Sequence, residues 1–181
     1  MTYIRWLIEP LPEGNGGQRE RERTLAYDIL CRLLDEERPR LEHDDKGAPF
    51  LPDHPDLHVS ISHCRAAVAV VVSPEGRVGI DVECRRRIGD GLMERVCTAE
   101  ELAAVRAAED PTMAFLQFWT RKEAVLKMRG TGIQGFGSMV DALAAKNVIV
   151  DDLDTRLPDV VAAMAWDRHT PRSAACCSQL S

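Results

Sequence analysis

Apolar residues recur at helical spacing in three parts of the chain. In residues 20–37 the charged residues fall on the opposite side, which predicts an amphipathic helix. Arg23 lies near the edge of this apolar stripe, at its N-terminal end. Similar patterns predict helices near residues 98–109 and 111–129. The stripe of the first helix consists of Leu25, Ile29, Leu30, Leu33 and Leu34.

Short runs of β-branched, aromatic or alternating apolar residues predict strands. Residues 57–62 alternate apolar and polar, whereas residues 66–72 are continuously apolar, as in a buried strand. Residues 38–56 hold four prolines and no period, which predicts a long loop. The other predicted strands are residues 2–8, 78–83, about 146–151 and 160–166.

The order of these elements predicts an α+β fold made of two similar halves. We place the boundary after residue 77, which gives an N-terminal half of residues 1–77 and a C-terminal half of residues 78–181. The two halves show no residue-level repeat. The last segment, residues 168–181, is polar and aperiodic, and we expect it to be loosely held.

Composition narrows the class of protein. The chain has 181 residues, of which 45% are hydrophobic, enough to bury one substantial core or two small ones. It contains no apolar run near the roughly 20 residues that cross a bilayer, and Arg5 and Glu9 interrupt the first apolar segment, where a signal peptide would be unbroken. We therefore expect a soluble, cytoplasmic protein. A net charge of −6 argues against broad nucleic-acid binding, so an anionic ligand needs a local basic cluster.

The six cysteines show neither a CxxC motif nor the spacing of a zinc finger. We expect reduced thiols, as in a cytoplasmic protein. Cys64 directly follows His63, but neighbouring residues of an extended chain point to opposite faces, which disfavours a Cys/His nucleophile. The sequence assigns no role to Cys176 and Cys177.

The segment VGIDVE, residues 78–83, places two carboxylates on one face of a strand. Because side chains alternate, Asp81 and Glu83 share a face with Gly79. The commoner explanation is a half-exposed strand with a solvated acidic face. The glycine leaves room for a ligand or for another backbone to approach closely.

The helix predicted for residues 111–129 has a clear start at Asp110-Pro111 and a stop at Gly130. Glu123 and Lys127 lie about 40° and 80° from the apolar Trp119, so they border the buried stripe. They form either an ordinary i, i+4 salt bridge or part of a site. If Glu123 meets Asp81 and Glu83, the three carboxylates suit Mg²⁺, and Lys127 can hold a phosphate.

Three other motifs have structural explanations beside functional ones. His63, at the end of a predicted strand, either contacts a ligand or is simply hydrogen-bonded. The segment GTGIQG, residues 130–135, follows a helix, so it fits a helix end and a mobile loop better than a dinucleotide-binding turn. Thr98 and Glu101 fit a capping box at a helix start.

Basic residues gather in several short runs, each of which alone is usually a solvated face. Several runs converging on one cleft would make an anion site inside an acidic protein. The runs are residues 18–23, Lys46, residues 85–87, and the group Arg121, Lys122 and Lys127.

Four segments in this order resemble the Sfp-type 4'-phosphopantetheinyl transferases. They are SISH at residues 60–63, VGIDVE at 78–83, VCTAEE at 96–101 and FWTRKEAVLK at 118–127. The resemblance implies a monomer of two similar α+β halves related by a pseudo-two-fold axis, with coenzyme A and Mg²⁺ in the cleft between them. It also implies an acyl or peptidyl carrier protein as partner, and no nucleic acid or membrane.

The same resemblance implies roles for particular residues. Asp81, Glu83 and Glu123 would ligate the metal, and Lys127 would bind phosphate. Glu123, Lys127 and His63 would be the catalytic group. The residues implied to bind coenzyme A are Arg23, at its 3'-phosphate, with Lys46, Ser62, His63 and Lys127.

The chain departs from the family pattern in two places. KGAP, residues 46–49, stands where the family commonly has Gly-Lys-Pro, so the role of Lys46 is open. The segment before the first long helix is short, and Arg19 and Arg21 are only candidates for basic residues found there in longer relatives.

The implied reaction transfers the phosphopantetheine arm of coenzyme A to a serine of the carrier protein. Glu123 is the first choice for the base. Two alternatives remain open: a coenzyme A-binding module without catalysis, and another Mg²⁺-dependent phosphoryl transferase. The sequence identifies neither the carrier protein nor the tolerance for acyl-coenzyme A.

Overall fold

The computed structural model describes residues 3–14, 17–131, 139–144 and 146–167. Within these ranges the chain forms an α+β fold with two antiparallel three-stranded sheets and one short hairpin. The α+β class expected from the sequence is thus confirmed. Most of the segment 130–135 and all of the tail 168–181 lie outside the described residues, as do Cys176 and Cys177.

The first sheet comes from the N-terminal part of the chain and has the strand order β1-β5-β4. Its strands are β1 (Arg5–Pro10), β4 (His58–His63) and β5 (Ala67–Ser73). Helix α1 (Gln18–Leu34) packs on one face of this sheet through Ile29, Leu30 and Leu33, all fully buried. The apolar period of the sequence therefore marks the contact face of the helix.

The second sheet has the order β6-β8-β7 and is covered by the longest helix. Helix α4 (Pro111–Arg129) packs on its outer face through Phe115, Leu116 and Val125, all fully buried. The strands are β6 (Val78–Cys84), β7 (Val148–Leu153) and β8 (Val160–Asp167). Three short helical segments complete this part: α2 (Asp90–Val96), α3 (Ala99–Ala107) and a 3₁₀ turn, Ala142–Ala144.

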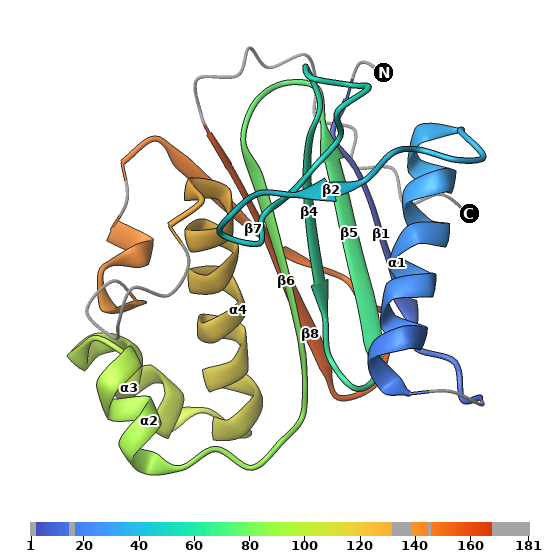
Figure 1. Ribbon diagram of the computed structural model, residues 1–181. Helices are drawn as coiled ribbons and strands as arrows, with labels where there is room; N and C mark the ends of the chain where they lie inside the picture. The colour runs from blue at the N-terminus through green and yellow to red at the C-terminus, as the bar shows by residue number, and fades with distance from the viewer. Residues whose placement is uncertain (1–2, 15–16, 132–138, 145, 168–181) are drawn as a thin grey trace.

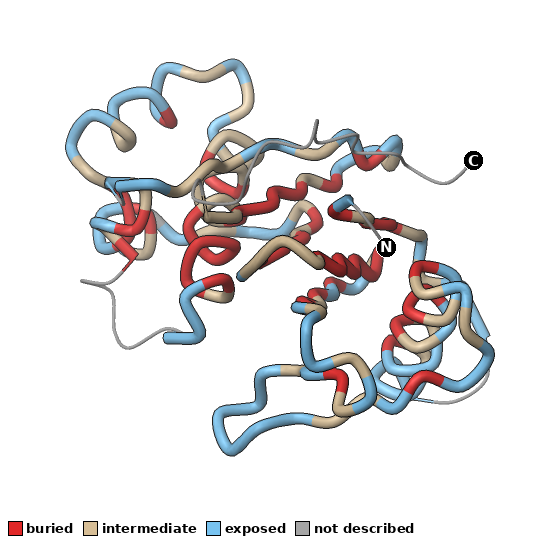
Figure 2. Tube along the Cα trace, turned by 90° about the horizontal axis from the view of Figure 1, so that it is seen from above, coloured by how far each residue is buried: buried red, intermediate tan, exposed pale blue. Residues whose placement is uncertain are grey.

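The two sheets face each other, and a helix covers the outer face of each (Figure 1). The layer between the sheets is filled by alternate residues of β1, β5, β6 and β8. Figure 2 shows the buried residues gathered in these strands and on the sheet-facing sides of the helices. On β6 this inner set is Val78, Ile80, Val82 and Cys84. Its outer set, Gly79, Asp81 and Glu83, therefore faces α4.

Strands β4 and β6 meet along a seam made by serine side chains. The Ser60 hydroxyl accepts a hydrogen bond from the Ile80 N–H (3.2 Å), and the Ser62 hydroxyl accepts one from the Val82 N–H (3.4 Å). The hydroxyls thus take the place of backbone partners between two edge strands. This seam joins the end of β4, and with it His63, to the acidic strand.

Most of the predicted elements are present, and the differences have local causes. The first helix ends at Leu34 rather than residue 37, because Asp35 adopts the left-handed conformation (φ 57°). The predicted proline-rich loop contains a hairpin of β2 (Glu42–His43) and β3 (Pro49–Phe50). Helix α2 was not predicted, because seven residues are too few for a helical period to be recognised. None of the described helices is both long and apolar enough to cross a membrane.

Candidate active site

Strand β6 turns its two carboxylates toward helix α4 rather than toward solvent. Asp81 is only 6% exposed and Glu83 is partly buried. The expectation of a half-exposed strand with a solvated acidic face is therefore wrong. The helix covers this face because β6 lies at the centre of the layered fold, with a sheet on one side and α4 on the other.

Gly79 explains how closely helix α4 approaches strand β6. A Cβ atom at this position would lie 2.1 Å from the Ala124 carbonyl oxygen and 2.5 Å from the Met128 nitrogen. Of the two reasons that the sequence allows for this glycine, the structure supports close approach of another backbone. Ala124 and Met128 directly follow Glu123 and Lys127 in the chain, so the contact brings those two side chains close to β6.

Helix α4 is fixed at both ends as the sequence predicts. The Asp110 carboxylate accepts a hydrogen bond from the Met113 N–H (3.1 Å), and Gly130 ends the helix with φ 66°. Lys127 Nζ lies 2.7 Å from Asp81 Oδ1 and 3.2 Å from the Ile80 carbonyl oxygen. Lys127 is therefore tethered to β6 and does not form a surface salt bridge along its own helix.

The acidic and basic side chains share one cavity of about 280 Å³. Burial, together with the nearby Asp81 and Glu83 carboxylates, raises the pKa of Glu123 to about 7, although Lys127 acts to lower it. Asp81, Glu83 and Glu123 thus all line this one cavity. The residues that line the cavity are Ile61, Ser62, His63, Asp81, Glu83, Trp119, Glu123 and Lys127.

The three carboxylates can be tested as a metal site. In the part of the chain that the structure describes, no three carboxylate, histidine or cysteine side chains already form a metal-binding group. Asp81 is instead paired with Lys127, and Glu83 with Arg86 (3.3 Å). Two observations nevertheless fit a divalent cation held by oxygen ligands. Asp81 Oδ2 is buried with no hydrogen-bond partner among the described residues, and Glu123 is a carboxylate crowded by two others.

Ser62 lies in the same cavity, but its hydroxyl faces β6. It donates to Asp81 Oδ1 (2.7 Å) and accepts from the Val82 N–H, and the residue is 5% exposed. In this arrangement the hydroxyl orients the Asp81 carboxylate.

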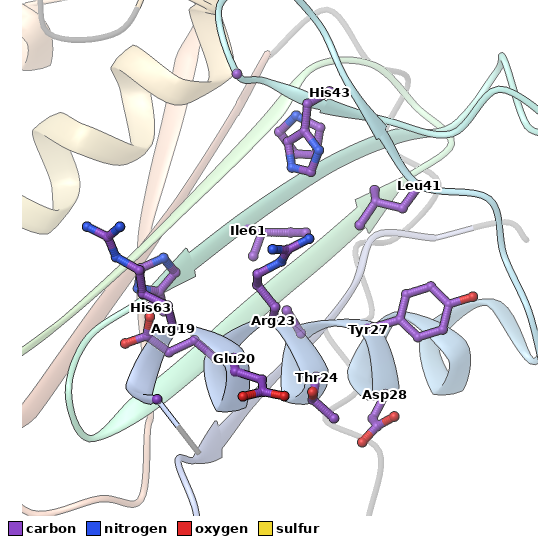
Figure 3. Close-up of a pocket in the computed structure, with 15 residues that line it drawn as sticks. Arg19, Glu20, Arg23, Thr24, Tyr27, Asp28, Leu41, His43, Ile61 and His63 are labelled. Carbon is purple, nitrogen blue, oxygen red and sulfur yellow. Dashed lines mark ion pairs between the residues drawn. The ribbon is translucent and has the colours of Figure 1, made fainter.

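A second and larger cavity, of about 1150 Å³, lies beside helix α1 and the β2–β3 hairpin. Figure 3 shows Arg19, Arg23, Tyr27, His43 and His63 around it. Both cavities are lined by Ile61 and His63, so they meet at the end of β4. A ligand extending from one cavity to the other would pass His63.

The predicted basic residues near this cavity separate into two groups. Arg19 and Arg23 line it. Lys46 is exposed and is not among the lining residues, although the adjacent Gly47 is. Arg21 donates to the Gly14 carbonyl oxygen (3.0 Å). The α1 arginines, rather than Lys46, therefore supply positive charge to the larger cavity.

Apart from Lys127, no basic residue of the runs 85–87 and 121–127 lines either cavity. Most of these side chains are held in ion pairs, and Arg86 pairs with Glu83, which itself lines the smaller cavity. The clearest case is Lys122, which is fully buried and lies 2.5 Å from Glu101, the residue that completes the capping box at Thr98. The remaining pairs are Arg85 with Asp110 and Asp159, Arg86 with Glu83, and Arg121 with Asp152.

Two residues of this region were not predicted from the sequence. Trp119 lines the smaller cavity and carries the Arg86 guanidinium 5.9 Å from its ring centre. Glu22 is 4% exposed and lies 3.3 Å from His63 Nδ1. A signal for Glu22 exists, because it falls in the helical register of the buried residues Ala26, Ile29 and Leu33.

Comparison with known proteins identifies the family of this chain. The family model of the 4'-phosphopantetheinyl transferase superfamily matches residues 77–171, which include β6, α4 and both acidic segments. The chain belongs to this superfamily. Its resemblance to the Sfp-type transferases, inferred from four short motifs, is thereby confirmed at the level of the family.

Individual members of the superfamily are similar over most of the chain. The transferase Sfp of Bacillus subtilis (strain 168) is 29% identical over 125 residues, which cover 64% of this chain and 55% of Sfp. AcpT of Escherichia coli (strain K12) is 34% identical over 130 residues, 67% of this chain and 66% of AcpT. AcpT of Salmonella typhimurium is 31% identical over 128 residues, 68% of this chain and 65% of AcpT. The matches thus span somewhat less than two thirds of each relative.

Proposed function

We propose that this superfamily member is a 4'-phosphopantetheinyl transferase that moves the phosphopantetheine arm of coenzyme A to a serine of an acyl or peptidyl carrier protein. The observation that carries the proposal is the meeting of Asp81, Glu83, Glu123 and Lys127 in one cavity. Two of these residues come from β6 and two from α4, and both elements lie within the matched residues 77–171.

In the proposed reaction the carrier serine oxygen forms a bond to the β-phosphorus of coenzyme A. The bond from that phosphorus to the bridging oxygen breaks, and adenosine 3',5'-bisphosphate leaves. Glu123 accepts the serine proton. A carboxyl group with a pKa of about 7 suits this step, because it is both available and basic enough near neutral pH. Lys127 places an ammonium beside the phosphates and stabilises the negative charge that develops there.

Mg²⁺ is the proposed cofactor, and Asp81, Glu83 and Glu123 are the residues that would hold it. When bound, a divalent ion supplies positive charge to the phosphate oxygens. The buried Asp81 Oδ2 without a hydrogen-bond partner among the described residues supports this assignment. The Ser62 hydroxyl, which donates to the other oxygen of Asp81, keeps that carboxylate turned into the cavity.

The larger cavity is the proposed site for the nucleotide part of coenzyme A. Its volume of about 1150 Å³ is ample for a ligand of this size, and Arg23 is suited to the 3'-phosphate. His63, where the two cavities meet, would contact the diphosphate. Ser62 and Lys46 would contribute only through local adjustment, since the Ser62 hydroxyl faces β6 and Lys46 lies outside the lining.

The proposal includes the division into halves of residues 1–77 and 78–181, related by a pseudo-two-fold axis, with the reacting end of the ligand in the cleft between them and the chain acting as a monomer. The nucleotide end would lie on the side of the N-terminal half, since every described residue that lines the larger cavity falls between residues 17 and 63. Support comes from the matching composition of the two parts, since each pairs a three-stranded antiparallel sheet with one long helix. The parts meet at the seam between β4 and β6 and across the apolar layer between the two sheets.

The test incubates the protein with an apo carrier protein, coenzyme A and Mg²⁺ and measures the intact mass of the carrier. The expected result is the addition of one phosphopantetheine arm. No added mass across fatty acid, polyketide and peptide synthase carriers would refute the proposal.

The variant Glu123→Gln separates this function from the alternatives. A transferase should lose most of its activity, whereas a binding module without catalysis should bind coenzyme A and modify no carrier even as wild type. A phosphoryl transferase acting on another substrate should not consume coenzyme A. Full activity in Glu123→Gln would overturn the roles assigned to Glu123.

A further inference from the structure

Glu22 is a buried carboxylate beside the candidate active site. It lies on the sheet-facing side of α1 and is 4% exposed. Its oxygens are 2.7 Å from Gln18 Nε2 and 3.3 Å from His63 Nδ1. A carboxylate removed from water is costly unless a positive or strongly donating group compensates it. His63 supplies that group from the neighbouring β4.

His63 occupies a position that a ligand would have to pass. It ends β4, lines both cavities, and its side chain is 55% exposed. Because Nδ1 lies against Glu22, the other ring nitrogen, Nε2, is on the opposite edge of the imidazole. That nitrogen is available to a ligand in the cavity.

We propose that Glu22 is a positioning residue that acts through His63. It holds the imidazole where the two cavities meet, with Nδ1 toward α1 and Nε2 toward the diphosphate of coenzyme A. The identity of the ligand rests on the function proposed above, whereas the pairing of Glu22 with His63 does not.

The chemistry of the pair favours an anionic ligand. A carboxylate accepts hydrogen bonds but donates none, so Nδ1 can bond to Glu22 only through an N–H. A phosphate oxygen is likewise an acceptor, so it binds Nε2 through a proton on that nitrogen. Arg19 and Arg23 line the same cavity and add to its attraction for a phosphate. The ring then needs no reorientation when the ligand binds.

The kinetic test compares Glu22→Ala, Glu22→Gln and His63→Ala in the full chain, using coenzyme A and an apo carrier. Glu22→Ala and His63→Ala should each raise the KM for coenzyme A about tenfold while kcat changes less than about twofold. Glu22→Gln should recover part of this loss, because its amide oxygen still accepts from Nδ1–H. Glu37→Ala is the control, since it removes an exposed carboxylate that follows α1 and lines neither cavity. It should not raise this KM.

A double-variant cycle distinguishes positioning from general support of the fold. If Glu22 acts through His63, Glu22→Ala/His63→Ala should have the same KM as His63→Ala alone. If the two effects multiply instead, the proposal is wrong. Thermal unfolding of each variant shows whether a loss of folded protein contributes. Should Glu22→Ala fail to fold, the cycle is repeated with Glu22→Gln, whose effect must also vanish in the His63→Ala background.

Nitrogen NMR of the imidazole tests the pairing without any reaction. In protein labelled with ¹⁵N-histidine, the His63 Nδ1 signal should be that of a protonated nitrogen in the wild type and in Glu37→Ala. It should shift in Glu22→Ala. Unchanged His63 signals in Glu22→Ala would refute the pairing. If wild-type protein neither binds coenzyme A nor modifies a carrier, the proposed function fails together with the diphosphate assignment, and the NMR comparison still decides whether Glu22 holds His63.

Discussion

Replacing Gly79 by alanine should damage the site from a distance, through the backbone contact between β6 and α4. The added Cβ would lie 2.1 Å from the Ala124 carbonyl oxygen, whereas ordinary contacts begin at 3.4 Å, so the strand and the helix must separate by about 1.3 Å. Gly79 has no positive φ, so the whole effect comes from space rather than from backbone strain. The obstructing atoms are backbone, which cannot rotate away as a side chain would.

The expected cost to stability is about 3 kcal/mol, at the upper end for overpacked cores. For a chain of this size, that cost lowers Tm by about 6 to 12 °C. The expected effect on catalysis is larger, because α4 carries Glu123 and Lys127 beside the contact. A misplacement of about 1 Å typically costs on the order of 100-fold in rate. We therefore expect kcat/KM for carrier modification to fall about 100-fold at a temperature where Gly79→Ala remains folded.

The measurement combines thermal unfolding with intact-mass kinetics on the apo carrier. Gly91→Ala is the control, because a Cβ at this exposed glycine of α2 would meet nothing within 4 Å. It should keep the Tm and the activity of the wild type. A Gly79→Ala protein with unchanged Tm would contradict the close approach. A lowered Tm with unchanged activity of the folded protein would show that this contact does not position Glu123 and Lys127.

Three further predictions concern Glu123 and the buried Cys64. In EDTA, the free energy of unfolding of the wild type, relative to that of Glu123→Gln, should fall as the pH rises from about 4.5 to about 7. The reason is that the unfolded chain releases the Glu123 proton near pH 4.5, whereas the folded chain releases it near pH 7. This fall should be no more than about 3 kcal/mol. Urea unfolding at several pH values measures it, and a difference in the free energy of unfolding that does not change with pH would contradict the prediction. Added Mg²⁺ should stabilise the wild type above pH 7 and should stabilise Glu123→Gln less. Burial raises the pKa of the Cys64 thiol to about 12. Peptide mapping after alkylation at pH 8 should therefore find Cys64 unmodified in native protein and modified in urea. Rapid labelling of Cys64 in native protein would instead show that β4 opens.

The motifs of the sequence identified the residues of the smaller cavity well. Asp81 and Glu83 alternate with apolar residues, and a strand period of two leaves no choice but to put them on one face. Glu123 and Lys127 fall one turn apart at the margin of an apolar stripe, which places them at the edge of a buried contact. Both features are local, because alternation along a strand and spacing along a helix depend only on residues that are close together in the sequence.

The sequence could not decide what covers the acidic face of β6. A solvated face was the commoner explanation for the pattern, and it is wrong because a helix about 40 residues further along the chain packs there. The same limit applies to Lys122. The sequence groups it with other basic residues as a candidate anion ligand, whereas the fold buries it against Glu101.

The sequence by itself determined the types and order of most helices and strands, the ends of α4, and the two acidic segments that carry the candidate chemistry. Those features depend on periodicity, capping and backbone preference, which act over a few residues. Only the tertiary structure decided that Lys127 pairs with Asp81, that Glu22 lies against His63, and that two cavities meet at the end of β4. Each of these contacts joins residues far apart in the chain, so it depends on how the layers pack and not on any local pattern.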